Sequence, residues 1–313
     1  MNRVLVVGSM NVDLSASVSH LPAAGETILG AGSEPMTGGK GANQAIAAGR
    51  LGADVAMVAA AGTDAFGDQA CAALAAAGVD ISGIRRIDGA VTGLALITVA
   101  AGGENTIVVC SGANDLLDPE TATAAGQTAS AGDVMLLQLE VPLGTALAAA
   151  SAASARGAIV ILNAAPLPAL RDDSFDDLLR ACQVLVVNEV EALALAGCPA
   201  PETTAEWIDL AGVLCATGPA TCVITLGANG AVAASADTGS HQPAFPVDSV
   251  DTTGAGDSFC ATLGAGLAAG FDLPTALRRA CAAGALSTTA LGAQSALPTD
   301  ADLDALLSAE QVG

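Results

Sequence analysis

The sequence predicts an α/β fold in which a doubly wound, mostly parallel sheet lies between helices, with a small β-sheet lid. Three observations support this prediction. Short apolar runs alternate with segments long enough for helices over most of the chain. Two glycine-rich turns each open a helix, at residues 38–44 and 251–257. The hydrophobic share is 52% but the aromatic share is only 2%, so Ala, Val, Leu and Ile must build the core, which suits buried parallel strands.

The lid is predicted from strand patterns that have no helix between them. These patterns occupy residues 14–18, 26–29, 92–99 and 105–109. The last two alternate in polarity and are joined by a turn at 101–104, which is typical of a hairpin. We therefore expect lid strands from about residues 12–36 and 90–112, within one unit that spans residues 1–313.

The remaining elements alternate as a doubly wound fold requires. Strands are predicted at 4–7, 55–60, 134–138, 159–162, 184–187 and 222–225, followed by a hairpin at 231–234 and 243–247. A helix is predicted from the first glycine-rich turn to about residue 51, and an acidic helix at the end of the chain. Further helices are predicted at 66–77, 119–130, 143–155, 175–181, 204–216, 258–269 and 273–289.

Polar residues follow most of the predicted strands of the main sheet. They are Asn11 and Asp13, Gln138 and Glu140, Asn163, Asn188 and Glu191, and Thr225 before Gly227. Because open α/β sheets bind ligands beyond the carboxyl ends of their strands, we expect these groups to line one site. Each also has a structural alternative, since Asn and Asp form turns and Asn188 with Glu191 fits a helix capping box.

The stretch Asp251-Thr252-Thr253-Gly254-Ala255-Gly256-Asp257 predicts an anion site. Its glycines let backbone N–H groups approach a ligand, and the helix that follows adds unpaired N–H groups and the positive end of its dipole. Asp257 would repel an anion there, unless its role is to remove a proton from a hydroxyl that then attacks a phosphate. The alternative is an ordinary acidic residue in the first turn of a helix.

The stretch Gly38-Gly39-Lys40-Gly41-Ala42-Asn43-Gln44 is the second glycine-rich helix start. It lacks the spacing and the Ser or Thr of a P-loop. Its glycines still bring the backbone close to a ligand, and Asn43 follows Lys40 by about one helical turn, so both side chains are expected to face that ligand. Lys40 is the only lysine in the chain, which favours a role in the site over a role on the surface.

The formal net charge of −22 argues against nucleic acid and anionic membranes as partners. A phosphorylated ligand must then be neutralised mainly by backbone N–H groups and bound cations. We expect a cytoplasmic protein, because the sequence shows neither a signal-peptide pattern nor an apolar run of roughly 20 residues. Eight cysteines without a Cys-x-x-Cys pair, and only two histidines, argue against zinc. The acidic, lysine-poor composition fits either a GC-rich genome or salt adaptation.

The two glycine-rich stretches, one near each end, resemble those of the ribokinase family of sugar kinases, and the likeness runs from Val4 to Gln294. Residues 9–13, the loop with Lys40, and Gln138-Leu139-Glu140 are most similar to the ribose kinases of that family. The resemblance implies a Rossmann-like domain with a β-sheet lid that also forms a homodimer interface. It also implies ATP-dependent phosphorylation of D-ribose at its 5-hydroxyl.

The resemblance further implies roles for individual residues. Asp257 would be the catalytic base, beside an anion hole formed by Gly254, Ala255 and Gly256. The sugar would contact Asn11, Asp13, Gly39, Lys40, Gly41, Asn43, Glu140 and Asp257. ATP would contact Asn188, Thr225, Gly227, Gly256 and Cys281.

Two cations are implied in the same way. Mg²⁺ would accompany ATP near Glu191, through water, and a monovalent cation, usually K⁺, would be held by Asp251, Thr253, Ser287, Ala290 and Gly292. The chain departs from the family at Cys281, where a polar residue is expected near the adenine. It departs again at Ser295-Ala296, where the serine stands one position early for the last cation ligand.

Three alternatives remain open at the level of the sequence. In the first, the same chemistry acts on deoxyribose, fructose or a nucleoside, although a nucleoside favours aromatic partners, of which this chain has few. In the second, the protein senses a sugar or nucleotide without catalysis, which would not require Asp257. In the third, it is a dinucleotide-dependent oxidoreductase, but residues 7–10 lack the required glycine spacing after the first strand.

Overall fold

Two sheets organise the fold, described from a computed structural model that covers residues 2–32, 35–236 and 238–310. Among these residues, a 9-stranded main sheet has the order β14-β13-β12-β11-β10-β9-β1-β5-β6. Neighbouring strands are parallel from β12 to β6, whereas β13 and β14 run antiparallel at one edge. The bounds are β1 Val4–Val7, β5 Val55–Gly62, β6 Asp80–Ile87, β9 Val134–Leu137, β10 Ile159–Asn163, β11 Val184–Asn188, β12 Thr221–Thr225, β13 Ala231–Ser235 and β14 Gly239–Gln242.

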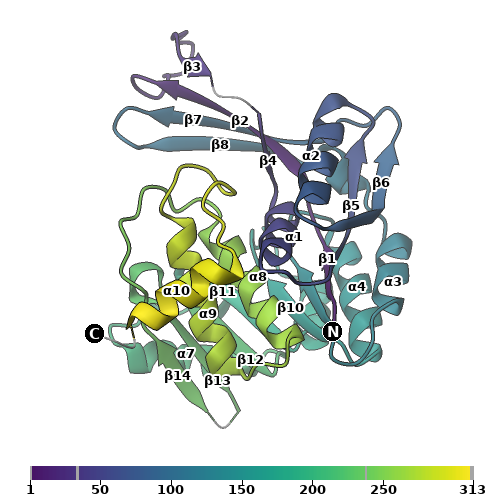
Figure 1. The fold of residues 1–313 in the computed structure, drawn as a ribbon, viewed down its shortest axis with the longest axis vertical. Helices are drawn as coiled ribbons and strands as arrows, with labels where there is room; N and C mark the ends of the chain where they lie inside the picture. The colour runs from purple at the N-terminus through teal and green to yellow at the C-terminus, as the bar shows by residue number, and fades with distance from the viewer. Residues whose placement is uncertain (1, 33–34, 237, 311–313) are drawn as a thin grey trace.

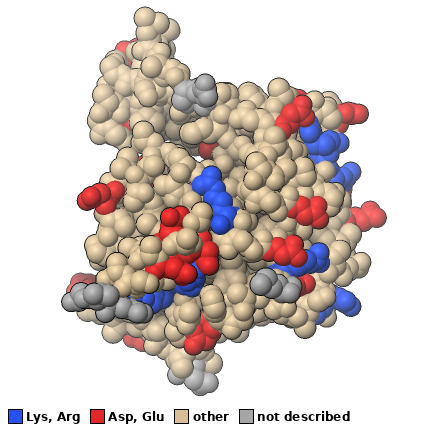
Figure 2. Space-filling model, in the orientation of Figure 1, with Lys and Arg blue, Asp and Glu red and all other residues tan. Residues whose placement is uncertain are grey.

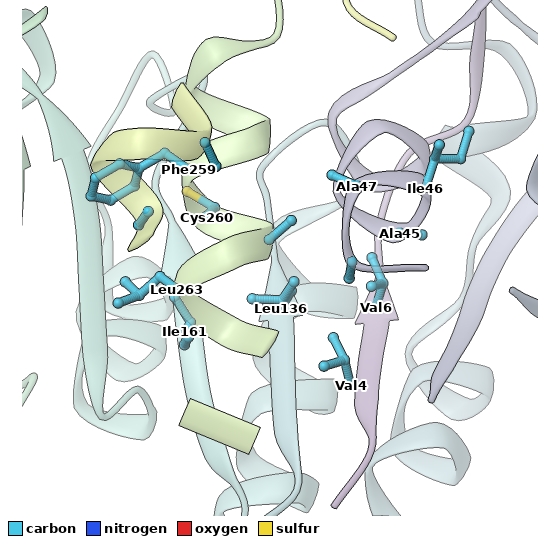
Figure 3. Packing of buried hydrophobic residues seen from close by; sticks show 14 of the residues in the cluster. Val4, Val6, Ala45, Ile46, Ala47, Leu136, Ile161, Phe259, Cys260 and Leu263 are labelled. Carbon is cyan, nitrogen blue, oxygen red and sulfur yellow. The ribbon is translucent and has the colours of Figure 1, made fainter. Parts of the chain in front are cut away.

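Helices cover both faces of the main sheet, because its central strands are apolar on both sides. In β1, Val4 and Val6 pack on one face, and Leu5 and Val7 on the other. The first face is covered by α1 (Lys40–Arg50), α2 (Ala65–Ala76), α8 (Ala255–Ala268), α9 (Leu273–Ser287) and α10 (Asp300–Glu310). The second is covered by α3 (Pro119–Gln127), α4 (Leu143–Ala155), α5 (Asp173–Ala181), α6 (Glu189–Ala196) and α7 (Thr204–Cys215). Figure 3 shows side chains of the first face meeting α1 and α8.

The smaller sheet projects from one end of the main body (Figure 1). Its strands are β2 (Asn11–Val18), β3 (Ala31–Gly32), β4 (Met36–Gly38), β7 (Gly93–Ala100) and β8 (Asn105–Cys110). Strand β2 pairs in parallel with β7, and β7 continues into an antiparallel hairpin with β8. The predicted α/β fold, with a large sheet between helices and a separate small sheet, is therefore confirmed.

Two strand predictions were wrong. Residues 26–29 form no strand, and Leu29 is 96% exposed, so this apolar residue has no sheet face to pack on. The second strand of the C-terminal hairpin is β14, before residue 243 instead of after it. Pro243 and Pro246 lack the N–H groups that a strand ladder needs, which explains why residues 243–247 are irregular.

The structure also contains elements that the sequence does not predict. Strand β6 is charged and interrupted by Gly83, so it shows neither an apolar run nor a clean alternation. Helix α6 follows β11 directly, and its first turn is closed by the capping box of Asn188 and Glu191. Two short 3₁₀ turns lie at η1 (Gly112–Leu116) and η2 (Gly227–Asn229). None of the described helices combines the length and the apolarity needed to cross a membrane.

The topology brings seven strand ends to one edge of the described main sheet. The parallel strands β1, β5, β6, β9, β10, β11 and β12 all end there. Helix α8 packs against α1 and against the sheet, so the two glycine-rich turns that open these helices meet at the same edge. Residues 213 positions apart in the sequence thereby come into direct contact.

We expect the substitution Leu136→Ala to lower the free energy of unfolding by about 2–5 kcal/mol, because it leaves a cavity in a site where nothing is exposed to solvent. Leu136 lies in the central strand β9 with 0% exposure, facing α8 (Figure 3). The matched control is Leu170→Ala, since Leu170 is 83% exposed. Chemical denaturation should give a change within about 0.5 kcal/mol for the control; equal losses in both variants would contradict the packing described here.

Candidate active site

Two adjoining cavities open at the edge of the sheet where the strands end. The smaller, of about 270 Å³, is lined by Lys40, Asn163, Asn188, Glu191, Gly254 and Asp257, among others. The larger, of about 450 Å³, is lined by Thr225, Gly227, Phe245, Phe259, Gly284 and Cys281, among others. Thr225, Thr252 and Gly256 line both cavities. The two spaces therefore meet at the turn that opens α8.

Asp257 lies in the first turn of α8, and its carboxylate is almost completely buried. Its Oδ2 accepts a hydrogen bond of 3.0 Å from the Asn43 amide, and its Oδ1 accepts one of 3.1 Å from the Gln44 amide. Burial raises the pKa of Asp257, while Lys40 and the two amides oppose that rise. Asp257 is thus a buried carboxylate at the wall of the smaller cavity. It accepts two side-chain hydrogen bonds, which an exposed acidic residue in a first turn does not need.

The loop that opens α1 is fixed to Glu140, which follows β9. Oε2 of Glu140 accepts hydrogen bonds from the Ser9 hydroxyl, at 2.5 Å, and from the Lys40 backbone N–H, at 3.0 Å. The Ser9 hydroxyl in turn accepts from the Gly41 N–H at 3.2 Å. The carboxylate of Glu140 and the hydroxyl of Ser9 therefore join three segments that are distant in sequence: the one after β1, the start of α1 and the one after β9.

The glycines of this loop are required by close backbone packing. Gly39 has a φ of 86°, and a Cβ at that position would lie 2.8 Å from the Asn11 backbone nitrogen. A Cβ at Gly41 would lie 2.7 Å from the backbone of Ser9. Both contacts are too short for any side chain. The loop can approach β1 and β2 only because these positions carry no side chain.

Asn11 and Asp13, the predicted sugar residues at the start of β2, lie beside the glycine-rich loop that opens α1. Asn11 is buried, and its Oδ1 accepts a hydrogen bond of 2.7 Å from Asn114. Asp13 is half-buried, and its carboxylate packs against Gly38. Burial raises the pKa of Asp13 from 3.8 to about 6, with further contributions from the negative charges of Glu140 and Asp257. These three carboxylates thus lie close enough to repel one another.

Lys40 supplies the positive charge of this group of carboxylates. Asp257 is the main cause of a raised pKa for Lys40, with smaller contributions from Glu140 and Glu191, whereas burial opposes the rise. Lys40 therefore stays protonated, with the carboxylates of Asp257, Glu140 and Glu191 near it. Its position in the smaller cavity agrees with the expectation that the only lysine of the chain belongs to the site.

The predicted anion-binding turn contains two glycines in different surroundings. Gly254 is the residue before α8 and has a φ of 78°, and a Cβ there would lie 2.8 Å from the Ala293 side chain. A Cβ at Gly256 would meet no atom within 4 Å. The Ala255 N–H donates to the Thr252 carbonyl at 3.2 Å, and the open space at Gly256 leaves the backbone of this first turn accessible from both cavities.

The predicted nucleotide residues fall into two groups. Thr225, Gly227, Gly256 and Cys281 line the larger cavity, and Asn188 lines the smaller one. Cys281 is buried, which raises the pKa of its thiol to about 12, so the thiol is neutral. The larger cavity is walled mainly by apolar side chains, as suits a planar base.

Of the residues predicted to hold a monovalent cation, three are connected by hydrogen bonds: Asp251, Thr253 and Gly292. Asp251 links the loop before α8 to the segment after α9: its Oδ1 accepts from the Thr253 N–H at 2.9 Å, and its Oδ2 accepts from the Gly292 N–H at 2.8 Å. Hydrogen bonds from Gly292 and Thr253 lower the pKa of Asp251 against the effect of its burial. The Ser287 hydroxyl donates to Gly284 at 2.8 Å, which leaves its own carbonyl as the available ligand. Ala290 lies between these residues in sequence.

Several residues were given no such role from the sequence. Gln138 was expected to line the site, but it is completely buried and forms, with Gln44, an amide chain that ends at Asp257. Gln294 donates to Asn43 Oδ1 at 2.9 Å. Asn114 orients Asn11, and Ser9 orients Glu140. The available sequence signal was position: Gln44 and Ser9 lie within the stretches already considered, and Gln138 and Asn163 end strands. Asn114, in η1, carries no such signal.

We expect the substitution Asp13→Asn to stabilise the protein at neutral pH, because it removes a carboxylate that burial and two neighbouring charges disfavour. The pKa of Asp13 rises from 3.8 to about 6 in the folded state, so the ionised group destabilises the fold above pH 6. Chemical denaturation should show a gain of ~1–3 kcal/mol above pH 6, since each pKa unit corresponds to 1.36 kcal/mol. The gain should shrink as the pH falls from 6 towards 4. A gain that is independent of pH would contradict this electrostatic account.

Comparison with known proteins agrees with this geometry. Residues 1–300 match the family model of the pfkB carbohydrate kinases. The ribokinase of Bacillus subtilis is 38% identical over 308 residues, which cover 98% of this chain and 100% of that protein. The deoxyribokinase of Salmonella typhi is 33% identical over 305 residues, covering 97% of this chain and 98% of that protein.

A solved structure points in the same direction. The structure of Arabidopsis thaliana ribokinase complexed with ribose and ATP matches with a TM-score of 0.86 at 30% identity, covering 98% of each chain. The fold, the carboxylate beside an anion-binding turn and these similarities together show that the chain belongs to the pfkB family of carbohydrate kinases, and it is a phosphotransferase that acts on a sugar hydroxyl.

Proposed function

We propose that the protein transfers the γ-phosphoryl group of ATP to the 5-hydroxyl of D-ribose, giving D-ribose 5-phosphate and ADP. One observation carries this proposal: the buried carboxylate of Asp257 lies beside the turn at Gly254–Gly256, where the two cavities meet. The similarity to ribokinases along nearly the whole chain supports ribose as the acceptor. Asp257 is the group that takes the proton of the attacking hydroxyl.

The sugar is held by the polar groups that converge on Asp257. Asn11, Asp13, Asn43 and Glu140 offer amide and carboxylate oxygens, each of which accepts hydrogen bonds from sugar hydroxyls. Lys40 donates to the sugar and offsets the charges of Asp257, Glu140 and Glu191. Gly39 and Gly41 bring the backbone close enough to complete the site. Because a hydroxyl both donates and accepts, this mixture of groups suits a small polyol.

The phosphate groups lie at the start of α8. The N–H groups of Gly254, Ala255 and Gly256 stabilise the negative charge that develops during transfer. The Ala255 N–H also donates to the Thr252 carbonyl at 3.2 Å, so a phosphate oxygen shares this donor. Such neutral donors suit a chain with a formal charge of −22, which has few basic side chains to spare. The base of ATP occupies the larger cavity, with Thr225, Gly227 and Cys281 at its walls and Asn188 near the phosphates.

Two cations complete the proposed site. Mg²⁺ binds with ATP near Glu191, whose carboxylate lines the phosphate cavity with Asn188 and supplies the oxygen ligand that Mg²⁺ prefers, through water. Mg²⁺ neutralises charge on the phosphates. In the described chain no three His, Cys, Asp or Glu side chains are grouped to hold a metal, so water and phosphate oxygens would provide the remaining ligands.

The loop that Asp251 joins to Gly292 fits a monovalent cation such as K⁺. Asp251, Thr253, Ser287, Ala290 and Gly292 would hold it, mainly through backbone carbonyls. Asp251 keeps its negative charge there, because its hydrogen bonds lower its pKa. Ser295 supports the loop by donating its hydroxyl to the carbonyl of Leu291, so its position one residue early still allows it to order this segment. The cytoplasmic location expected from the sequence stays a prediction.

Deoxyribose is the second candidate acceptor, because a deoxyribokinase is also similar over nearly the whole chain. A panel of acceptors in an ADP-release assay distinguishes the two. We expect the highest kcat/KM with D-ribose, ahead of deoxyribose, fructose and nucleosides, and higher rates with K⁺ than without it. A higher kcat/KM with deoxyribose would assign the protein to that substrate, and no ADP release with any acceptor would contradict the proposed reaction.

The substitution Asp257→Asn should reduce turnover by about 10²–10⁴-fold, because the amide cannot accept the proton of the attacking hydroxyl. Binding of ATP, measured by calorimetry, should change by less than about threefold, since Asp257 does not line the larger cavity proposed for the base of ATP. Asp115→Asn serves as the matched control: Asp115 is exposed in η1, and its loss should not change turnover. Turnover near the wild-type rate in Asp257→Asn would refute the role of Asp257 as base.

We also propose a homodimer formed through the small sheet. Strand β8 is exposed along its whole length although it carries Ile107, Val108 and Val109. Neither β7 nor β8 contains a charged residue, and Figure 2 shows few charged side chains on the visible face of this projection. Val108 pairs with Leu96, and these residues are 59% and 44% exposed. An apolar surface of this kind on a strongly acidic protein favours a second copy as the partner.

The substitution Val108→Arg should convert the dimer into a monomer, because it places a charge in the apolar interface. The register puts Val108 and Leu96 on the face of the sheet opposite Asp13, so the change does not enter the sugar site directly. Analytical ultracentrifugation measures the mass. Val213→Arg is the matched control, because Val213 on α7 is also 59% exposed. A dimer that persists in Val108→Arg would place the interface elsewhere.

A further inference from the structure

A chain of buried amides ends at the carboxylate of Asp257. The Gln138 side chain donates its Nε2 to Gln44 Oε1 at 2.6 Å, and Gln44 donates its Nε2 to Asp257 Oδ1 at 3.1 Å. Gln44 and Gln138 are completely buried, and Asp257 is 5% exposed. The three residues come from α1, the end of β9 and α8, so the chain crosses the interior between three elements.

The direction of this chain follows from the charge at its end. An ionised carboxylate only accepts hydrogen bonds, so Gln44 must turn its NH₂ group towards Asp257. The carbonyl oxygen of Gln44 then faces Gln138, which must turn its own NH₂ group towards it. Each amide can donate to the next group in only one orientation. The negative charge of Asp257 therefore determines the orientations of both the Gln44 and the Gln138 amide.

The far end of the chain is consistent with that direction. Among the described residues, Oε1 of Gln138 is the buried side-chain polar atom that lacks any hydrogen-bond partner. It packs against Gly8, where a Cβ would come within 2.0 Å of it. Buried polar groups are nearly always paired, so an unpaired oxygen needs a reason. Here it is the acceptor left over when both amides point their NH₂ groups towards the base.

We propose that Gln44 is a positioning residue that holds Asp257 ionised and correctly rotated for proton transfer, and that Gln138 acts by fixing the orientation of the Gln44 amide. This inference rests on the proposed function of Asp257 as base. It assigns Gln44 to the catalytic base instead of to the sugar. Gln44 has 0% exposure, so its side chain presents no surface to a ligand.

The second carboxylate oxygen is fixed in a similar way from the other side. Asn43 donates to Asp257 Oδ2 at 3.0 Å, and Asn43 Oδ1 accepts from Gln294 at 2.9 Å. Two consecutive residues of α1 therefore hold one oxygen each. Gln44 also donates to Asn163 Oδ1 at 3.3 Å, which ties it to the end of β10. Because Asn43 also lies in the proposed sugar site, only Gln44 separates the positioning of the base from the binding of substrate.

Other charged and titratable groups also act on Asp257, and the experiment must keep them unchanged. They are Lys40 from α1, Glu140 after β9, Asp13 from β2 and Cys260 from α8. Replacing Gln44 by Met removes the hydrogen bonds, retains the length of the side chain and adds no charge. All four groups remain in place in that variant.

The direct test is the pKa of Asp257 in Gln44→Met, followed by NMR of ¹³C-labelled aspartate carboxyls, with Asp257→Asn used to assign the signal. We expect the pKa to rise by about one unit, because the ionised form loses one of its hydrogen-bond donors. The acidic limb of the pH profile of kcat/KM should move up by the same amount, and kcat at neutral pH should fall about tenfold. The KM for ATP should stay within about threefold. An unchanged pKa for Asp257 would overturn the proposal.

The variant Gln138→Met provides a second test that leaves Gln44 in place. It should raise the pKa of Asp257 in the same direction but by less, because Gln44 keeps its donor and loses only its fixed orientation. In Gln44→Met/Gln138→Met the second change should add nothing to the pKa or to kcat. An additive effect would show that Gln138 acts independently of Gln44 and would refute the chain. Since the NMR titration needs no substrate, it decides this proposal even if the wild type phosphorylates no sugar.

Discussion

The structure depends on keeping one carboxylate charged in a place that excludes water. Burial alone drives Asp257 towards its neutral form, and a neutral acid cannot accept a proton. Lys40 and the amides of Asn43 and Gln44 act against burial. These three residues lie within the first turn and a half of α1, so the charge on α8 depends on how closely these two helices approach each other at their starts.

That approach explains why both turns are rich in glycine. The sequence suggests that the glycines bring the backbone close to a ligand, but most of them bring it close to other backbone. Gly39 and Gly41 pack on the segment after β1, and Gly254 packs on Ala293. Gly256 differs, since a Cβ there would point into free space at the meeting of the two cavities. Only this last glycine is free of packing constraints, so its lack of a side chain is best explained by the ligand.

The sequence predicts what depends on composition and position, and it misses what depends on pairing in space. The parallel strands appear because they are apolar on both sides, whereas β6 is charged and lies at an edge, so its pattern is not distinctive. Asp257 and Lys40 stand out because a carboxylate in an anion turn and a single lysine are unusual. Gln44 does not, because glutamine is common in helices, and Gln138 stands out only as a polar residue at a strand end. Their role arises only when α1, β9 and α8 bring three polar groups together in the interior.

The site also brings carboxylates together whose repulsion a bound ligand would reduce. Burial, together with repulsion from Glu140 and Asp257, raises the pKa of Asp13 to about 6. A sugar hydroxyl donates a hydrogen bond to an ionised carboxylate and so favours its charged form. On the proposed function, binding of the sugar therefore lowers the pKa of Asp13 and releases its proton when the pH is near 6. The repulsion between these carboxylates lowers the stability of the fold. The same repulsion favours a ligand with many hydroxyl donors, because such a ligand stabilises the ionised carboxylates.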